Sequence, residues 1–255
     1  MQKILLFAFM LLGSSQLVAQ VPGYLGKRLS ATFNFQSMLA FNGPTYKNKG
    51  QEEFDSDGTA FSNRFELNAS YTLSREFTVV VAVERSRTGV GIDLTNPQNN
   101  EFVKQFYQLR NTSFQASIRK FSATKGALAP YGIYGGLGLK VTRTKGNIAR
   151  DIILDIPGRD ESDAVDVGVD KRQFLYYFTA DLGSNRIIAD RFLLNLSLRF
   201  GLPLNLKRLG KWIGQDDFNG TIEQRNQEEY EQKVFQRMLS HSVIMANIGV
   251  GYLIY

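Results

Sequence analysis

The sequence of 255 residues contains no cysteine and a single histidine, His241. The absence of thiols excludes a disulfide framework and a thiolate metal site, and a lone imidazole argues against a polyhistidine zinc or di-iron centre. Basic residues exceed acidic ones by six, but they form no concentrated run of the kind that binds nucleic acid. We therefore expect no cofactor, no bound metal and no nucleic-acid partner.

Long hydrophobic runs are also missing, apart from one near the N-terminus. Lys3 precedes the apolar run Ile4–Leu12, and Ala19 ends a small-residue exit sequence. This run is too short to span a bilayer as a helix and fits the pattern of an export signal. We predict a signal peptide of residues 1–19, cleaved after Ala19 or, as an alternative, after Gln20. Residues 20–27 then lead into one domain of residues 28–255.

What the chain has in abundance is alternation of apolar and polar residues. In the last stretch, Ser240–Tyr255, every second residue from Ile244 to Ile254 is apolar, and the opposite face is smaller and more mixed. Successive side chains of a β-strand point to opposite faces, so this period of two predicts a strand. The same argument predicts eight strands in all: Arg28–Phe41, Phe61–Thr72, Phe77–Glu84, Phe106–Lys120, Pro130–Thr142, Phe174–Leu182, Phe192–Leu202 and Ser240–Tyr255.

The connections between these strands alternate between long and short. The four long ones are Asn42–Gly58, Arg85–Gln105, Arg143–Lys171 and Pro203–Arg237. This layout predicts an all-β fold, an eight-stranded antiparallel up-and-down transmembrane β-barrel with short periplasmic turns, long extracellular loops and both termini periplasmic. In the last loop, Glu228, Glu229 and Glu231 near Lys233 and Arg237 indicate a short helix, a hairpin or simply a solvated face.

A soluble barrel such as a lipocalin is the alternative, because alternation alone does not say which face points outward. The polar face is rich in small residues that fit a narrow interior, which favours lipid outside. Aromatic residues also fall at both ends of the apolar stripes, as in the two interfacial girdles of membrane barrels. They are Tyr71, Phe77, Tyr131, Phe192 and Tyr252 at the turn end, and Phe41, Phe61, Phe106, Phe174 and Phe200 at the loop end.

The chain resembles the small eight-stranded outer-membrane proteins, the OmpA-type transmembrane domain and OmpX, and the outer-membrane β-barrel proteins of Bacteroidetes. Ala129–Gly132, Asn247–Tyr252 and the apolar–aromatic ending at Tyr255 carry this resemblance, although such strands commonly end in Phe. It implies a monomer in the bacterial outer membrane, in contact with lipid and lipopolysaccharide. It also implies assembly by the barrel-assembly machinery, which reads the terminal strand, and PorT-like barrels of similar size suggest a role in protein secretion.

Seven charged residues fall on the inward face of the predicted barrel: Arg64, Glu66, Glu84, Arg119, Lys140, Asp181 and Arg199. Arg64 and Glu84 are symmetric about the turn near Ser74, so we expect them to face each other across two strands. Shielded charges must be paired, and eight strands leave room only for side chains. The sequence therefore predicts a lumen salt-bridge network that plugs the barrel, with a gated proton or ion path as the alternative.

His241 raises the alternative of a lipid-A-modifying enzyme. The resemblance is to eight-stranded outer-membrane deacylases, which use a His-x-Ser pair on one strand face together with a carboxylate. On a strand, however, Ser240 and Ser242 would point away from His241, and no acid follows it. A catalytic base needs its nucleophile within reach and a group that orients it. We therefore assign no catalytic residue.

The expected function is that of a non-enzymatic outer-membrane barrel with a plugged lumen. Its outer loops would carry a surface interaction with a protein partner, a role in envelope integrity or an accessory role in secretion. A small channel or a conduit for hydrophobic ligands is the second hypothesis.

Overall fold

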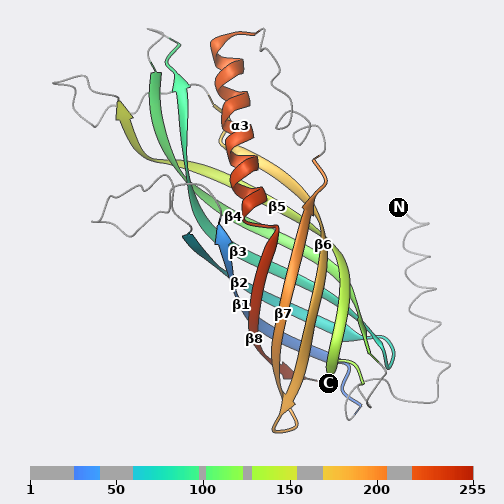
Figure 1. Ribbon diagram of the computed structural model, residues 1–255. Helices are drawn as coiled ribbons and strands as arrows, with labels where there is room; N and C mark the ends of the chain where they lie inside the picture. Colours follow the sequence, from blue (N-terminus) through green and yellow to red (C-terminus); the bar gives the residue numbers. More distant parts are fainter. Residues whose placement is uncertain are drawn as a thin grey trace.

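The computed structural model describes residues 26–40, 60–97, 102–122, 128–153, 169–205 and 220–254. Eight antiparallel strands pair in sequence order and β1 pairs with β8, which closes the barrel (Figure 1). The strands are β1 (Leu29–Ala40), β2 (Ala60–Thr72), β3 (Phe77–Thr95), β4 (Phe102–Phe121), β5 (Gly132–Ile153), β6 (Arg172–Ile188), β7 (Phe192–Pro203) and β8 (Ile244–Leu253). The predicted fold class is confirmed, while residues 1–19, predicted as the signal peptide, lie outside the described residues.

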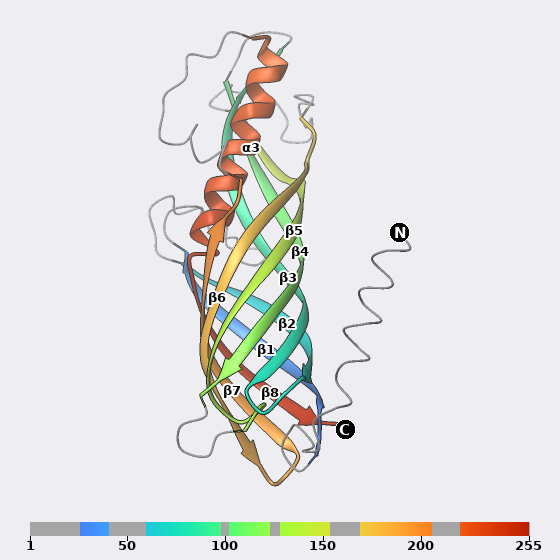
Figure 2. The same ribbon diagram turned by 90° about the vertical axis from the view of Figure 1, so that its right-hand side faces the viewer.

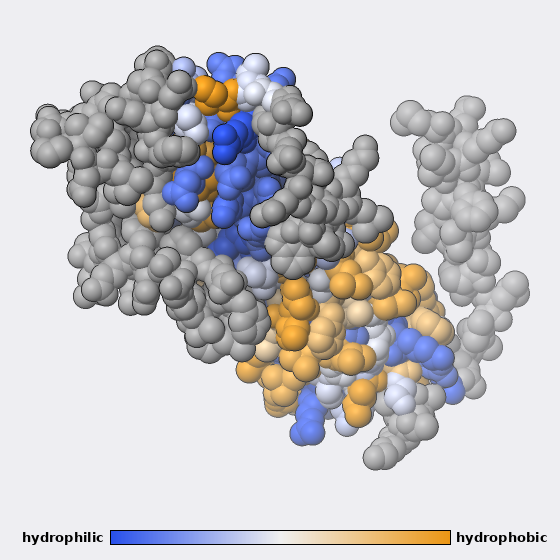
Figure 3. All heavy atoms as spheres, turned by 45° about the horizontal axis from the view of Figure 1, so that its top comes forward, coloured by the Kyte–Doolittle hydropathy of each residue, from blue (hydrophilic) through white to orange (hydrophobic). Residues whose placement is uncertain are grey.

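The lower part of the barrel, toward the short turns, is apolar outside and polar inside. Its exposed large hydrophobic side chains keep between 37% and 68% of their surface accessible. Figure 3 shows hydrophobic residues covering much of the lower barrel wall on the face in view. The side chains between them along each strand, such as Asn34, Thr179 and Asn195, are buried in the lumen. This arrangement agrees with the predicted alternation and excludes a lipocalin-like barrel, whose interior would be apolar.

The upper part of the barrel has the opposite polarity. β3, β4 and β5 continue well beyond their neighbours, and toward their ends the inward side chains become largely apolar, while Arg85, Arg87 and Arg110 point outward and are exposed. The inward residues form one core with the helix of the last loop. This core contains Val90, Ile92, Leu94, Tyr107, Leu109, Val169, Leu175, Tyr177, Tyr230, Val234, Phe235 and Met238.

The helix α3 (Ile222–Ser240) lies at the taller end, against the inner face of the extended strands (Figure 2). Its N-cap Thr221 and Gln224 form a reciprocal capping box. Tyr230, Val234 and Met238 recur every four residues, so they share the face that packs into the core. Within the described residues no helix is both long and apolar enough to cross a membrane.

The limits of several predicted elements were wrong. Arg85–Gln105 and the first part of Arg143–Lys171 were predicted as loops, but most of these residues extend β3, β4 and β5. The prediction took outward apolar residues as the mark of a strand, and above the exposed apolar belt the strands reverse that pattern. The closing strand begins at Ile244 rather than Ser240, because the backbone N–H of His241 donates to the Arg237 carbonyl and completes the last turn of α3.

The five turn-end aromatics are exposed at the turn end, as predicted. At the loop end Phe174 is exposed, but Phe106 is buried on the extended strands, where its ring lies 3.0 Å from the position of a Cβ at Gly91. The prediction for Phe106 was therefore wrong, because β4 continues past this residue. Phe41 and the side chain of Phe61 lie outside the described parts.

Candidate functional site in the barrel lumen

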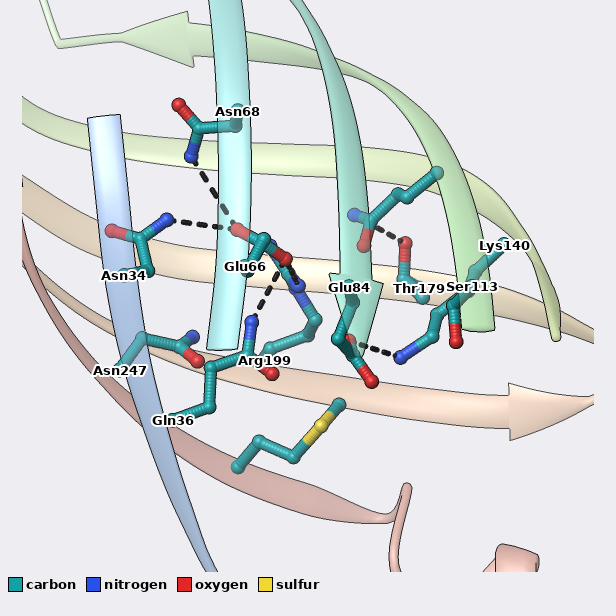
Figure 4. A network of polar contacts seen from close by, with 12 residues as sticks. Asn34, Gln36, Glu66, Asn68, Glu84, Ser113, Lys140, Thr179, Arg199 and Asn247 are labelled. Carbon is teal, nitrogen blue, oxygen red and sulfur yellow. Dashed lines mark hydrogen bonds and ion pairs between the residues drawn. The ribbon is translucent and has the colours of Figure 1, made fainter. Parts of the chain in front are cut away.

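The structure places all seven predicted lumen charges inside the barrel, and none exposes more than 6% of its side chain. They come from the inward faces of β2, β3, β4, β5, β6 and β7. Figure 4 shows part of this network from close by, with Glu66, Glu84, Lys140 and Arg199 labelled. Two carboxylates, those of Glu66 and Glu84, lie opposite each other on β2 and β3 and divide the network into two clusters.

Glu84 is the centre of the first cluster. Its Oε1 lies 2.8 Å from Nη1 of Arg64 and its Oε2 lies 2.5 Å from Nζ of Lys140. Both cations therefore bind one carboxylate through separate oxygen atoms. Charge-assisted hydrogen bonds of this kind are the strong ones, particularly where water is excluded.

Arg199 is the centre of the second cluster. Its guanidinium donates from Nε to Oδ1 of Asp181 at 2.7 Å and from Nη1 to Oε2 of Glu66. Asp181 also lies 3.5 Å from Nη2 of Arg119. Glu66 accepts two further hydrogen bonds at 2.8 Å, from the side-chain amides of Asn34 and Gln36. These bonds satisfy a carboxylate that would otherwise be costly to bury.

The contact between Arg64 and Glu84 exists, but the predicted register does not. Glu84 is the direct partner of Glu66, and Arg64 is the partner of Ser86, two residues further along β3. The arginine is long enough to reach Glu84 on the diagonal. The prediction placed the centre of the hairpin one residue too early, since Thr72 pairs with Thr78. Because the error is two residues in register, every side chain keeps its face.

Side chains also fill the lumen on either side of the network. At the turn end, the rings of Phe121 and Tyr134 lie 5.2 Å apart, and the guanidinium of Arg119 lies 4.6 Å from the centre of the Tyr134 ring. At the taller end, Nη2 of Arg64 donates to the carbonyl of His241 at 2.7 Å. A cation is favoured at the C-terminus of a helix, where carbonyl groups lack partners. Arg64 therefore connects the ion network to α3.

The residues around His241 form a chain of hydrogen bonds rather than a catalytic arrangement. Nε of Arg237 donates to the Thr88 hydroxyl at 3.0 Å, and the same hydroxyl forms a hydrogen bond of 3.3 Å with Nε2 of His241. The hydroxyl of Ser242 donates to the Met238 carbonyl. Within the described residues no carboxylate contacts His241. These contacts fix the C-terminal end of α3 to β3.

His241 is buried, and its pKa lies well below the ordinary value. Burial is the main cause, and the positive charges of Arg237 and Arg64 add to it. Burial also lowers the pKa of Arg237 to about 10. The folded protein therefore holds His241 as a neutral imidazole at neutral pH.

Sequence reasoning missed the amides of Asn34 and Gln36 that bind Glu66, and it missed Thr88. It named Arg237 only as part of a short helix, a hairpin or a solvated face. Asn34 and Gln36 lie on the predicted polar face of β1, so their direction was available but not their partner. Thr88 was assigned to a loop. The spacing of Tyr230, Val234 and Met238 was a signal that could have favoured the helix, which the structure shows as α3, over the hairpin and the solvated face.

No protein-family model matches the chain, and no curated protein matches it in sequence. Among solved structures, the chain is similar to the Neisserial surface protein NspA, with 11% identity, coverage of 89% of this chain and 97% of that one, and a TM-score of 0.40. The chain is also similar to the outer-membrane protein OprG of Pseudomonas aeruginosa, with 11% identity, coverage of 89% of this chain and 95% of that one, and a TM-score of 0.40. A third similar structure is that of the attachment invasion locus protein Ail of Yersinia pestis, in complex with the heparin analogue sucrose octasulfate. Its identity is 12%, the coverage is 89% of this chain and 98% of that one, and the TM-score is 0.38. The fold described above rests on the strand pairing of this chain itself.

Replacing Glu84 with Gln should strongly destabilise the folded barrel. The change leaves the charges of Arg64 and Lys140 buried without a counter-charge, so we expect a loss of about 3–5 kcal/mol in the free energy of unfolding. Equilibrium urea unfolding of the refolded barrel measures it. Glu76→Gln is the matched control, because Glu76 lies 3.9 Å from Lys120 in an exposed pair and should contribute less than about 1 kcal/mol. Equal effects of the two substitutions would contradict this assignment.

Acidification should weaken the docking of α3. When α3 is detached from the barrel, His241 is exposed and takes up a proton near pH 6.5, whereas the buried His241 of the docked state does not. The contribution of His241 to the docking of α3 is therefore present above pH 6.5 and is lost as the pH falls below it. Between pH 6.5 and 5.5 we expect a loss of roughly 1 kcal/mol. Amide hydrogen exchange of α3, corrected for the intrinsic pH dependence, measures this loss. His241→Asn should remove it, and an unchanged pH dependence in that variant would rule out His241 as its cause.

Proposed function

We propose that the protein is a non-enzymatic, integral outer-membrane β-barrel with a closed lumen, which acts through the surface of its taller end. The observation that carries this proposal is the exposed apolar belt around a closed barrel with a charged interior. Ile133, Leu137 and Leu202, for example, are 68%, 59% and 64% exposed. A soluble protein rarely exposes so large a contiguous apolar surface, while a bilayer buries it.

The orientation follows from the general layout of such barrels. The strands β2 and β3, and likewise β6 and β7, are joined by short turns at the end where β1 begins and β8 ends. Short turns face the periplasm in bacterial outer-membrane barrels, so both termini would be periplasmic and α3 extracellular. The taller end would then carry a surface interaction, a role in envelope integrity or an accessory role in secretion.

The closed lumen is supported by three successive obstructions. Phe121 and Tyr134 fill the turn end, the ion network crosses the middle, and the C-terminal turn of α3 lies above Arg64. An eight-stranded barrel is just wide enough for its own side chains. Opening a path would require the seven buried charges to exchange partners, which is costly in a low-dielectric interior.

A narrow hydrated path is the second candidate function. Buried oxygen atoms of Gln36, Gln115 and Asn247 have no hydrogen-bond partner within the described residues. Polar atoms of this kind favour some hydration of the lumen. The charged inner face does not favour a conduit for hydrophobic ligands.

Conductance across a planar bilayer that contains refolded protein distinguishes these two candidates. The proposal predicts no discrete current steps, because ions cannot cross the filled lumen. Heat-dependent migration on a gel confirms that the inserted protein is folded. Discrete, reproducible steps from folded protein would contradict the closed lumen and make transport the leading function.

A further inference from the structure

Four basic residues form a row across neighbouring strands on the outside of the taller end. Arg87 on β3 is the direct partner of Arg110 on β4, Arg110 is the partner of Lys145 on β5, and Lys145 is the partner of Arg172 on β6. All four side chains are exposed. We call these four residues the basic row.

Such a row is unfavourable without a counter-charge. Directly opposed side chains have Cβ atoms about 5 Å apart, and like charges in this arrangement repel each other. No ion pair within the described part of the chain involves any member of the row. The acid nearest along these strands on the same face is Asp170, two residues before Arg172, and one carboxylate does not neutralise four cations.

The basic row lies just beyond the apolar belt. Four residues below it along the same strands is a fully hydrophobic row, Val83, Phe114, Val141 and Tyr176, with 37–60% exposure. Between the two lies a mixed row, Arg85, Thr112, Arg143 and Phe174, which adds two exposed cations beside an exposed aromatic ring. Four residues span about 13 Å along a strand, and less in height because the strands are tilted.

Basic residues at this height meet the polar surface of the leaflet at the taller end. Arg and Lys side chains extend their apolar stems along such a boundary and place their charges among head groups. Arg binds phosphate through two parallel hydrogen bonds, and several cations within one row can contact one or two phosphate groups together.

We propose that the basic row is a binding site for the phosphate groups of anionic lipids in the leaflet around the taller end. This inference rests on the proposed membrane location and adds a specific ligand class to it. A soluble anion would gain nothing from the hydrophobic row four residues below. A phosphate carried on acyl chains contacts both rows at once, and this is the reason to favour a lipid.

The turn end of the barrel provides a matched control. Arg75, Lys120, Arg186 and Arg191 are exposed there, and no two of them are cross-strand partners. Two of them have partners of their own, since Lys120 lies near Glu76 and Nη1 of Arg191 donates to the Tyr252 hydroxyl at 3.1 Å. Equal positive charge is thus present at that end without the row.

The experiment compares the wild type with two fourfold variants refolded into vesicles of phosphatidylcholine and phosphatidic acid in a 4:1 ratio. The row variant is Arg87→Gln, Arg110→Gln, Lys145→Gln and Arg172→Gln, and the control variant changes the four turn-end residues to Gln. Native mass spectrometry of the barrel released into mild detergent measures the bound phosphatidic acid relative to phosphatidylcholine.

We expect the wild type and the control variant to retain phosphatidic acid preferentially. In the row variant, the ratio of bound phosphatidic acid to bound phosphatidylcholine should fall at least tenfold. A basic residue near an anionic membrane surface contributes roughly fivefold to binding, which makes this a lower bound. If the row variant does not fold, Arg110→Gln with Lys145→Gln removes the central pair and should reduce the preference several-fold. An unchanged preference in either row variant would overturn the proposal.

Two further arms separate the alternatives. Glycerol 3-phosphate, the head group without acyl chains, should not displace phosphatidic acid at equal concentration, and equal displacement would instead identify a soluble-anion site and overturn the lipid proposal. Insertion is checked first by gel migration and resistance to urea extraction. Failure to insert would contradict the membrane location, whereas an inserted barrel without phosphatidic-acid preference would contradict the basic-row proposal alone.

Discussion

The barrel depends on the mutual neutralisation of charges in its interior. Four cations and three carboxylates share the lumen, and each carboxylate contacts at least one cation. In a low-dielectric interior an unpaired charge is far more costly than a pair is beneficial, so the members of the network require one another. Because Arg64 also binds the C-terminal carbonyl of α3, the position of the helix at the taller end depends on the same network.

A change of solvent along the strands explains the rest of the architecture. Below Glu84, β3 turns Val81 and Val83 outward, and above it the same strand turns Arg85 and Arg87 outward and Val90 and Ile92 inward. In the proposed membrane location the lower part would have lipid outside, and the upper part water outside and an apolar core with α3. The helix fits there because its Tyr230, Val234 and Met238 face supplies the other half of that core.

The alternation of residues was enough to predict eight strands, the antiparallel barrel and the inward direction of all seven charges, because a period of two determines the face of each side chain. It was not enough for the strand ends, since Arg85 and Arg87 reverse the pattern without ending β3. The pairing of Glu66 with Asn34, Gln36 and Arg199 depends on register and closure, which one sequence does not reveal. The basic row was likewise hidden, because Arg87, Arg110, Lys145 and Arg172 lie far apart in the chain and meet only through strand pairing.

A double-mutant cycle between Glu66 and Arg199 tests the central role of the network most directly. Glu66→Gln, Arg199→Met and the double variant would each be unfolded by urea in the same lipid or detergent. The account predicts that each single change is costly and that the double change costs about 2–3 kcal/mol less than their sum, because it removes both charges together. Losses that add to within about 0.5 kcal/mol would contradict the interdependence of these buried charges.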